Sequence, residues 1–252
     1  MTSAQSIIVD SPLPGVPALH IAMQVQGNGD PLLLINGMTR PLQSWDPLTR
    51  WLHGRASVTF DAPGVGGSPT PRRPISIAGL AAVAASVLDA AGLGQADVVG
   101  FSHGGAVAQE FAHDFPERVR RLVLVSTSCG VGSTPGSRRD FIRGMRRPAD
   151  ANPWPLPDPL GVLWHSIAVS SWSSIPFLGS IQAPTLVVCG TSDRVVPPAN
   201  SRILAERIPN ASLILIPGGH DLQRGDQGRV MAGIIEDFLP AISATQGLRT
   251  SD

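Results

Sequence analysis

The feature that most constrains the fold of this chain is a series of short segments rich in Val, Ile and Leu. They span residues 31–35, 56–60, 96–101, 119–125, 184–189 and 211–216. Apolar runs without polar alternation are typical of strands that are covered on both faces, as in a parallel sheet. The chain is therefore expected to fold into a sheet with helices on both sides.

Helical patterns separate these segments, as such a fold requires. Apolar residues recur at helical spacing after Ser76, a candidate N-cap, and again within residues 230–238. Residues 7–9 and 20–26 predict one or two antiparallel edge strands. Together these patterns predict an α/β fold with a doubly wound, mostly parallel sheet.

One long segment, residues 130–174, interrupts this rhythm. It contains no convincing strand and carries glycines, a cluster of arginines and several prolines. In a compact domain, such an insertion is more often a lid or a binding segment than a plain connection. We predict a core made of residues 1–129 and 175–252, a loose tail over 243–252, and a short lid over 130–174. The arginines fit a solvated helix face or, alternatively, a site for an acidic group.

The composition excludes several kinds of chemistry. The 19 basic side chains are all arginine, and the chain contains neither lysine nor tyrosine. P-loops and Schiff-base enzymes need a lysine, and a tyrosine acid or nucleophile is impossible here. The 19 basic residues balance 19 acidic ones, so no long-range field attracts nucleic acid or an anionic membrane.

Cysteine usage and hydropathy give further expectations. Cys129 and Cys189 are the only cysteines, too few for a disulfide framework or a multi-thiolate zinc site, and are interpreted as small buried residues. The first residues lack the pattern of a signal peptide, and no stretch is long and apolar enough to span a bilayer. These features predict a cytoplasmic protein with no membrane span, and no metal or organic cofactor is implied.

One motif points to nucleophilic catalysis. Residues 100–105 read GFSHGG, which places Ser102 in a G-x-S-x-G motif between a predicted strand and a predicted helix. In this setting the serine occupies a strained turn that lifts its hydroxyl above the sheet, and Gly100 and Gly104 leave room for that turn. We therefore predict that Ser102 is the nucleophile.

A serine hydroxyl needs a base, and the base needs an acid that orients it. In folds with this motif, the chain order is nucleophile, acid, histidine. Asp193 follows one predicted strand and His220 follows the next, so both lie at carboxyl ends of parallel strands. We predict a triad of Ser102, Asp193 and His220, with Asp221 as the nearby alternative carboxylate.

The remaining candidate residues concern substrate binding. The backbone amides of Met38 and His103 are predicted to form an oxyanion hole. Gly37, next to Met38, lets the backbone approach the substrate. Trp164 and Trp172 of the predicted lid are candidate substrate-binding residues for a small-molecule substrate.

Several stretches carry a family resemblance. They are residues 61–68 (DAPGVGGS), 70–74 (TPRRP), 104–118 (GGAVAQEFAHDFPER) and 207–211 (RIPNA), together with Asn36-Gly37. The chain resembles the α/β-hydrolase superfamily and, within it, is similar to the intracellular medium-chain polyhydroxyalkanoate depolymerases. This resemblance implies a serine esterase that works through an acyl-enzyme on medium-chain 3-hydroxyalkanoate esters or polyester. The glycine-rich residues 61–68 lack the order of a phosphate-binding loop and are interpreted as a shaping turn.

The chain departs from the resembled family at two places. His103 stands where that family usually carries tryptophan, so it is either a pocket residue or a tolerated replacement. Residues 130–174 are also shorter than the family's lid.

Two alternative functions stay open. One is a cofactor-free dioxygenase on the same fold. Its catalytic acid would follow the strand that comes after the helix next to Ser102, but residues 126–129 at that place contain no carboxylate. The other is a non-catalytic receptor for a small ligand, against which an intact triad argues.

Overall fold

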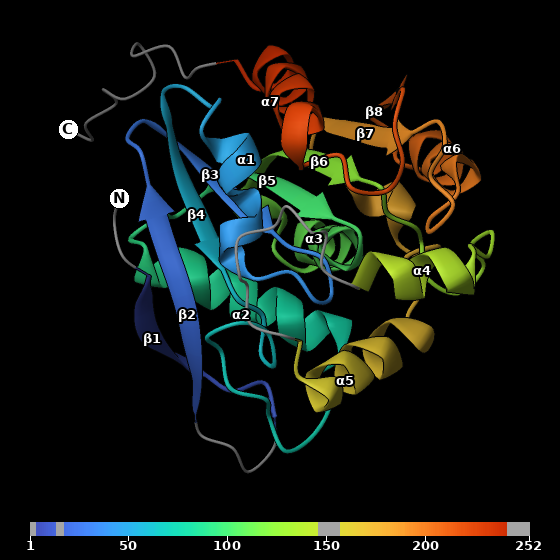
Figure 1. Ribbon diagram of the computed structural model, residues 1–252. Helices are drawn as coiled ribbons and strands as arrows, with labels where there is room; N and C mark the ends of the chain where they lie inside the picture. The colour runs from blue at the N-terminus through green and yellow to red at the C-terminus, as the bar shows by residue number, and fades with distance from the viewer. Residues whose placement is uncertain (1–3, 14–17, 146–156, 241–252) are drawn as a thin grey trace.

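The computed structural model describes residues 4–13, 18–145 and 157–240, and its centre is an eight-stranded sheet between helices (Figure 1). The strands are β1 (Gln5–Asp10), β2 (Ala18–Gln26), β3 (Asp30–Ile35), β4 (Arg55–Phe60), β5 (Ala96–Phe101), β6 (Val119–Val125), β7 (Thr185–Gly190) and β8 (Ala211–Ile216). The α-helices are α1 (Asp46–Thr49), α2 (Ile77–Ala90), α3 (His103–Asp114), α4 (Arg138–Met145), α5 (Pro159–Ser170), α6 (Pro198–Arg207) and α7 (Gly225–Phe238). Short 3-10 helices span Leu42–Trp45, Pro116–Arg118 and Leu178–Ser180.

The strands follow the order β1-β2-β4-β3-β5-β6-β7-β8. Strand β2 pairs antiparallel with β1 and β4, and all other neighbours are parallel. Each of the six predicted strands is present with ends shifted by at most one residue, and the two edge strands are present as well. The predicted α/β fold with a mostly parallel sheet is confirmed.

Successive residues of the central strands belong to opposite hydrophobic cores. Leu33 and Ile35 pack with side chains of α2 and α3, whereas Leu32 and Leu34 pack with side chains of α1 and α7. All four are buried. Because both faces of the sheet are covered, both sets of residues must be apolar, which explains why the strand segments show so little alternation.

Helix α2 shows how local sequence signals set an element's limits. The Ser76 hydroxyl accepts a hydrogen bond from the Gly79 amide at 3.0 Å, as expected of an N-cap, which typically contributes about 1 kcal/mol. Gly92, just beyond the helix, has a φ of 71°, a left-handed conformation that glycine adopts without strain. The predicted helix after Ser76 is therefore confirmed.

The predicted lid segment contains α4 and α5 among its described residues. The backbone ahead of α4 is fixed to the core, since the Ser137 amide donates to the Arg194 carbonyl at 2.7 Å. Helix α5 packs on the loop after β4, where His165 Nε2 lies 2.9 Å from the Pro63 carbonyl oxygen. The division into a core and a lid stays a prediction, and the proposed tail over 243–252 lies outside the described residues.

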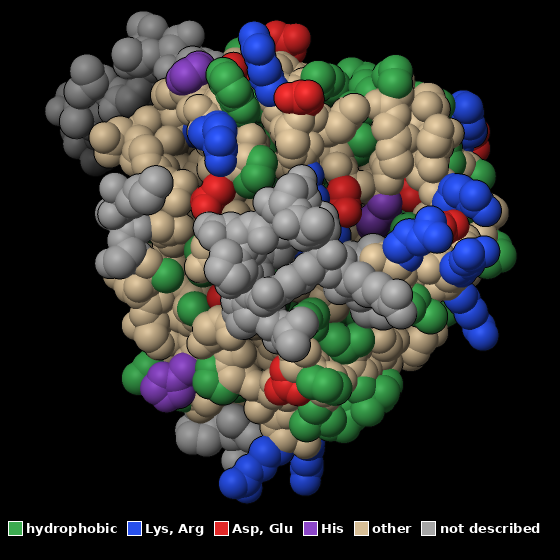
Figure 2. Space-filling model, in the orientation of Figure 1, with side chains coloured by type: hydrophobic (Ala, Val, Ile, Leu, Met, Phe, Trp, Pro, Cys, Tyr) green, Lys and Arg blue, Asp and Glu red, His purple; other side chains and the backbone are tan. Residues whose placement is uncertain are grey.

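The surface of this region combines charged and apolar side chains. Figure 2 shows arginine side chains gathered on the side where α4 lies, and Arg138, Arg139 and Arg143 of that helix are exposed. This agrees with a solvated helix face. Within the described ranges, no helix has both the length and the apolar character needed to cross a lipid bilayer.

Candidate active site

Ser102 occupies a strained turn between β5 and α3, with a φ of 54° and a ψ of −117°. A side chain at Gly104 would place its Cβ 2.2 Å from the Ile35 carbonyl oxygen, so this position needs glycine. Strand β6 and the loop after it hold the turn: the Ser102 amide donates to the Val125 carbonyl at 2.9 Å, and the Thr127 hydroxyl donates to the Ser102 carbonyl at 2.7 Å. The surrounding sheet therefore maintains the strained conformation that exposes the serine hydroxyl.

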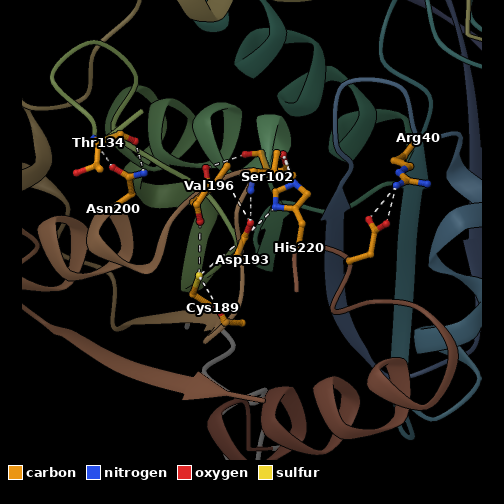
Figure 3. A network of polar contacts seen from close by, with 12 residues as sticks. Arg40, Ser102, Thr134, Cys189, Asp193, Val196, Asn200 and His220 are labelled. Carbon is orange, nitrogen blue, oxygen red and sulfur yellow. Dashed lines mark hydrogen bonds and ion pairs between the residues drawn. The ribbon is translucent and has the colours of Figure 1, made fainter. Parts of the chain in front are cut away.

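The structure brings Ser102, His220 and Asp193 together in one chain of hydrogen bonds (Figure 3). His220 Nε2 lies 3.0 Å from Ser102 Oγ, and His220 Nδ1 lies 2.8 Å from Asp193 Oδ2. The three residues come from the loops after β5, β7 and β8, at the carboxyl edge of the sheet. A carboxylate facing Nδ1 places the ring proton there, which leaves the Nε2 lone pair directed at the serine hydroxyl.

Asp193 is fully bonded within the protein. Its side chain has 0% exposure, and its Oδ1 accepts hydrogen bonds from the amides of Val195 and Val196, each at 2.9 Å. The thiol of Cys189 lies 3.9 Å from Oδ2, and burial raises the pKa of this thiol to about 11. The buried charge of Asp193 is thus balanced by amide donors, and Cys189 stays a neutral buried residue, as does the equally buried Cys129.

The alternative carboxylate, Asp221, has another partner. Arg40 Nη2 lies 2.8 and 2.9 Å from its two carboxylate oxygens (Figure 3). This ion pair joins the loop after β3 to the loop that carries His220. No local sequence pattern predicts this ion pair, because its two residues are 181 positions apart.

The loop after β3 carries the predicted oxyanion residues. The Asn36 side chain fixes it, accepting from the Gly37 amide at 3.1 Å and donating to Ser44 Oγ at 2.6 Å. Across the described part of the chain, the amides of Met38 and His103 donate no hydrogen bond to a protein acceptor. Both N–H groups are therefore available to a ligand oxygen.

An open cavity of about 390 Å³, including its mouth, lies beside Ser102. It is lined by Gly37, Met38, Thr39, Arg40, Phe101, Ser102, Phe141, Val195 and His220. The sequence did not single out Phe141, which α4 brings to this cavity, or Val195, which follows Asp193. The lining combines the polar atoms of Ser102 and His220 with a largely apolar wall, which suits an acyl group.

The structure does not bring Trp164 and Trp172 to this cavity. The Trp164 indole donates to the Pro71 carbonyl at 3.0 Å, and the Trp172 indole donates to Glu110 Oε2 at 2.6 Å. A buried indole N–H needs such a partner, and these partners hold both rings elsewhere. Among the described residues of the 130–174 segment, Phe141 is the aromatic side chain that lines this cavity.

His103 lines a second cavity, which shares Gly37 and Arg40 with the first. Its ring packs edge-on against the ring of His165, with centroids 4.8 Å apart. Of the two interpretations left open by the sequence, this position favours a pocket residue.

Comparison with known proteins agrees with this geometry. Residues 30–154 and 138–224 match the family described as alpha/beta hydrolase fold. The chain belongs to this family. It is 39% identical over 238 residues to a poly(3-hydroxyalkanoate) depolymerase of Ectopseudomonas oleovorans, covering 83% of this chain and 84% of that protein. It is 31% identical to a 2-hydroxymuconate semialdehyde hydrolase of Pseudomonas putida, covering 87% of this chain and 90% of that one.

Solved structures show the same fold. A hydrolase from Pseudomonas aeruginosa PA01 superposes with a TM-score of 0.79 at 24% identity, covering 94% of this chain and 98% of that one. A thermophilic esterase from Thermogutta terrifontis gives a TM-score of 0.77 at 23% identity, covering 92% and 97%. The family and these relatives agree with the prediction of a carboxylic ester hydrolase.

Proposed function

We propose that this family member is a serine esterase that cleaves medium-chain 3-hydroxyalkanoate esters, or their polyester, through an acyl-enzyme on Ser102. The observation that carries the proposal is the unbroken chain of hydrogen bonds from Asp193 through His220 to Ser102, beside a largely apolar cavity. The relative named poly(3-hydroxyalkanoate) depolymerase supports the substrate class.

In the acylation step, Ser102 Oγ forms a bond to the ester carbonyl carbon while His220 Nε2 takes the hydroxyl proton. The carbonyl electron pair moves onto its oxygen, which accepts hydrogen bonds from the amides of Met38 and His103. Asp193 stabilises the imidazolium that forms and holds its orientation. When the carbon–oxygen bond of the leaving alcohol breaks, His220 returns the proton to that oxygen.

Deacylation repeats these roles with water. His220 takes a proton from a water molecule whose oxygen attacks the acyl carbon, and then returns it to Ser102 Oγ as the ester bond breaks. The products are a free carboxylic acid and the restored serine.

The contacts of His220 favour this function over the two alternatives. The acid on His220 is Asp193, after β7, whereas residues 126–129, where the dioxygenase acid would lie, contain no carboxylate. A receptor without catalysis has no need for a histidine placed 3.0 Å from a strained serine hydroxyl.

A series of esters with one leaving group and acyl chains from acetyl to decanoyl tests the proposal, together with a medium-chain polyhydroxyalkanoate latex. Each buried methylene contributes about 0.8 kcal/mol, so two more carbons inside the pocket raise kcat/KM by roughly tenfold. We expect kcat/KM to rise up to about hexanoyl or octanoyl and then to level off, and the latex to clear. Preference for acetyl esters with an untouched latex would contradict the substrate class and leave the serine hydrolase in place.

A further inference from the structure

The ring of His103 contains a buried polar atom that the mechanism above does not use. The side chain is only 7% exposed, and none of the described residues forms a hydrogen bond with its Nε2. Buried polar atoms in folded proteins nearly always have a partner, so an unpaired one needs an explanation. One explanation is a ligand atom that completes the site.

The environment fixes the position of this ring. The His165 ring contacts it edge-on, and His165 is itself held by its 2.9 Å contact with the Pro63 carbonyl oxygen. Burial and the neighbouring His165 lower the pKa of His103 well below its ordinary value. His103 is therefore a neutral imidazole, which offers one N–H donor and one lone pair rather than a charge.

The cavity next to His103 encloses about 330 Å³ including its mouth, but it is narrower than the cavity beside Ser102 and has room for about one water-sized group. Most of its wall is apolar: Ile35, Phe60, Ala62, Leu80 and Val107. Asn36 and Arg40 also line it, but their side chains already bind Ser44 and Asp221. A single small polar group of a ligand therefore fits this cavity, whereas an acyl chain does not.

The cavity is adjacent to the reacting carbonyl. Gly37 and Arg40 line both this cavity and the one beside Ser102. In the proposed mechanism, the amide of His103 itself binds the carbonyl oxygen of the substrate. A ligand group that reaches His103 Nε2 must consequently branch from the acyl chain close to the carbonyl.

We propose that His103 is a specificity-determining residue that binds the oxygen on C3 of the acyl chain, two carbons from the carbonyl. The proposal rests on the esterase function proposed above and names the residue that would recognise the C3 oxygen of its 3-hydroxyacyl substrates. A hydroxyl donates and accepts, so it pairs with Nε2 in either tautomer of the ring. An acyl chain with only hydrogen at C3 leaves Nε2 unpaired, and the site discriminates against it.

The test compares two esters with the same leaving group, 3-hydroxyhexanoyl and hexanoyl, by their kcat/KM values. The wild type is expected to favour the hydroxylated ester by about 5- to 100-fold. His103→Leu removes the polar atom and should bring this ratio close to one, whereas His103→Gln, which keeps a donor and an acceptor, should retain part of it. The matched control is His113→Leu on the exposed side of the same helix, which should keep the wild-type ratio.

Several results would overturn the proposal. A wild-type ratio near one contradicts it without any variant. So does an unchanged ratio in His103→Leu, or an equal loss on both esters, which would mean that the ring only fills space or holds a permanent water. If thermal denaturation shows that His103→Leu does not fold, the wild-type ratio and His103→Gln decide the question. Hydrolysis of neither ester by the wild type would instead refute the proposed esterase.

Discussion

Two histidines flank Ser102, and they differ in how completely the protein satisfies them. His220 uses both ring nitrogens on protein partners, and both oxygens of its acid, Asp193, accept hydrogen bonds. His103 directly follows the nucleophile in sequence, but within the described residues its buried Nε2 has no hydrogen-bond partner. The side of the site that performs proton transfer is complete without a ligand, whereas the side that faces the acyl group is not. In the proposed mechanism, the groups that act on every ester are therefore already paired within the protein. The choice between different acyl groups depends on contacts that form only when a substrate is bound.

The two sides also differ in their supports. Asp193 and His220 follow the adjacent strands β7 and β8, which pair along six residues each. The His103 side depends on the loop after β4, where Asp61 accepts hydrogen bonds from the amides of Leu42 at 2.6 Å and Gly67 at 2.8 Å. One side is held by the sheet and the other by a buried carboxylate within a loop.

The largest effect expected from this comparison is on the proton-transfer side. Asp193→Asn should keep the fold but favour the wrong tautomer of His220, with a loss in kcat that approaches ~10⁴-fold, as in serine proteases. Asp221→Asn weakens the ion pairs with Arg40 and Arg224 and should lower kcat by about tenfold, through small displacements of the two loops that the Arg40 pair joins. Steady-state kinetics of both variants on one ester shows which substitution causes the larger loss. A larger loss for Asp221→Asn would show that the wrong carboxylate has been placed in the triad.

A smaller effect is expected on the acyl side, from the wall of the cavity beside Ser102. Phe141→Ala removes apolar surface from that wall and should lower kcat/KM for octanoyl esters by roughly 3- to 10-fold, with less effect on acetyl esters. The neighbouring Ile142 is 53% exposed and does not line the cavity, so Ile142→Ala is the matched control. Equal losses of kcat/KM on octanoyl and acetyl esters, or the same chain-length dependence in both variants, would show that Phe141 does not contact the acyl chain.

A separate effect, on stability rather than on activity, concerns the loop after β4. Burial raises the pKa of Asp61 from 3.8 to about 6, against the two amide hydrogen bonds that lower it. Between these values the folded protein keeps a proton that the unfolded chain has lost, so the contribution of Asp61 to stability is largest below about pH 4 and falls as the pH rises to 6. The stability of the wild type relative to Asp61→Asn should therefore increase by up to about 3 kcal/mol from pH 7 to pH 4.

Urea denaturation at several pH values measures this difference, because the other titrating groups are common to both proteins. A constant difference between the wild type and Asp61→Asn would mean that Asp61 titrates near its ordinary value. If the wild type instead gains stability relative to Asp61→Asn as the pH rises to 7, folding lowers the pKa of Asp61 rather than raising it.

Most of the fold and the geometry around Ser102 follow from local patterns in the sequence. Strands β5, β6 and β8 match their predicted limits residue for residue. For β5 and most of β6 the reason is burial, because a strand covered on both faces must be apolar throughout, whereas β8 is a partly exposed edge strand. Ser102, Asp193 and His220 could be located because each follows such a strand at the carboxyl edge of the sheet. Glycines at positions without room for a Cβ marked the turn itself.

The contacts that the sequence did not reveal are those made between distant loops. Arg40 and Asp221 meet only because the loops after β3 and β8 end at the same edge. Trp164 was assigned to substrate binding by its type and its segment, but its position depends on a carbonyl of the loop after β4. Phe141 gave no signal, since it lies in a helix whose exposed arginines predict only a solvated face.

The central claim is that Ser102 forms the covalent intermediate, and labelling with an organophosphonate ester tests it most directly. The serine oxygen bonds to phosphorus, the leaving group departs, and the adduct is located by intact mass and peptide mapping. We predict one adduct per chain, on the peptide that contains Ser102, and no labelling of Ser102→Ala, whose kcat should fall by roughly 10³ to 10⁶-fold. An adduct on another serine, or a Ser102→Ala variant with near wild-type ester hydrolysis, would contradict the account.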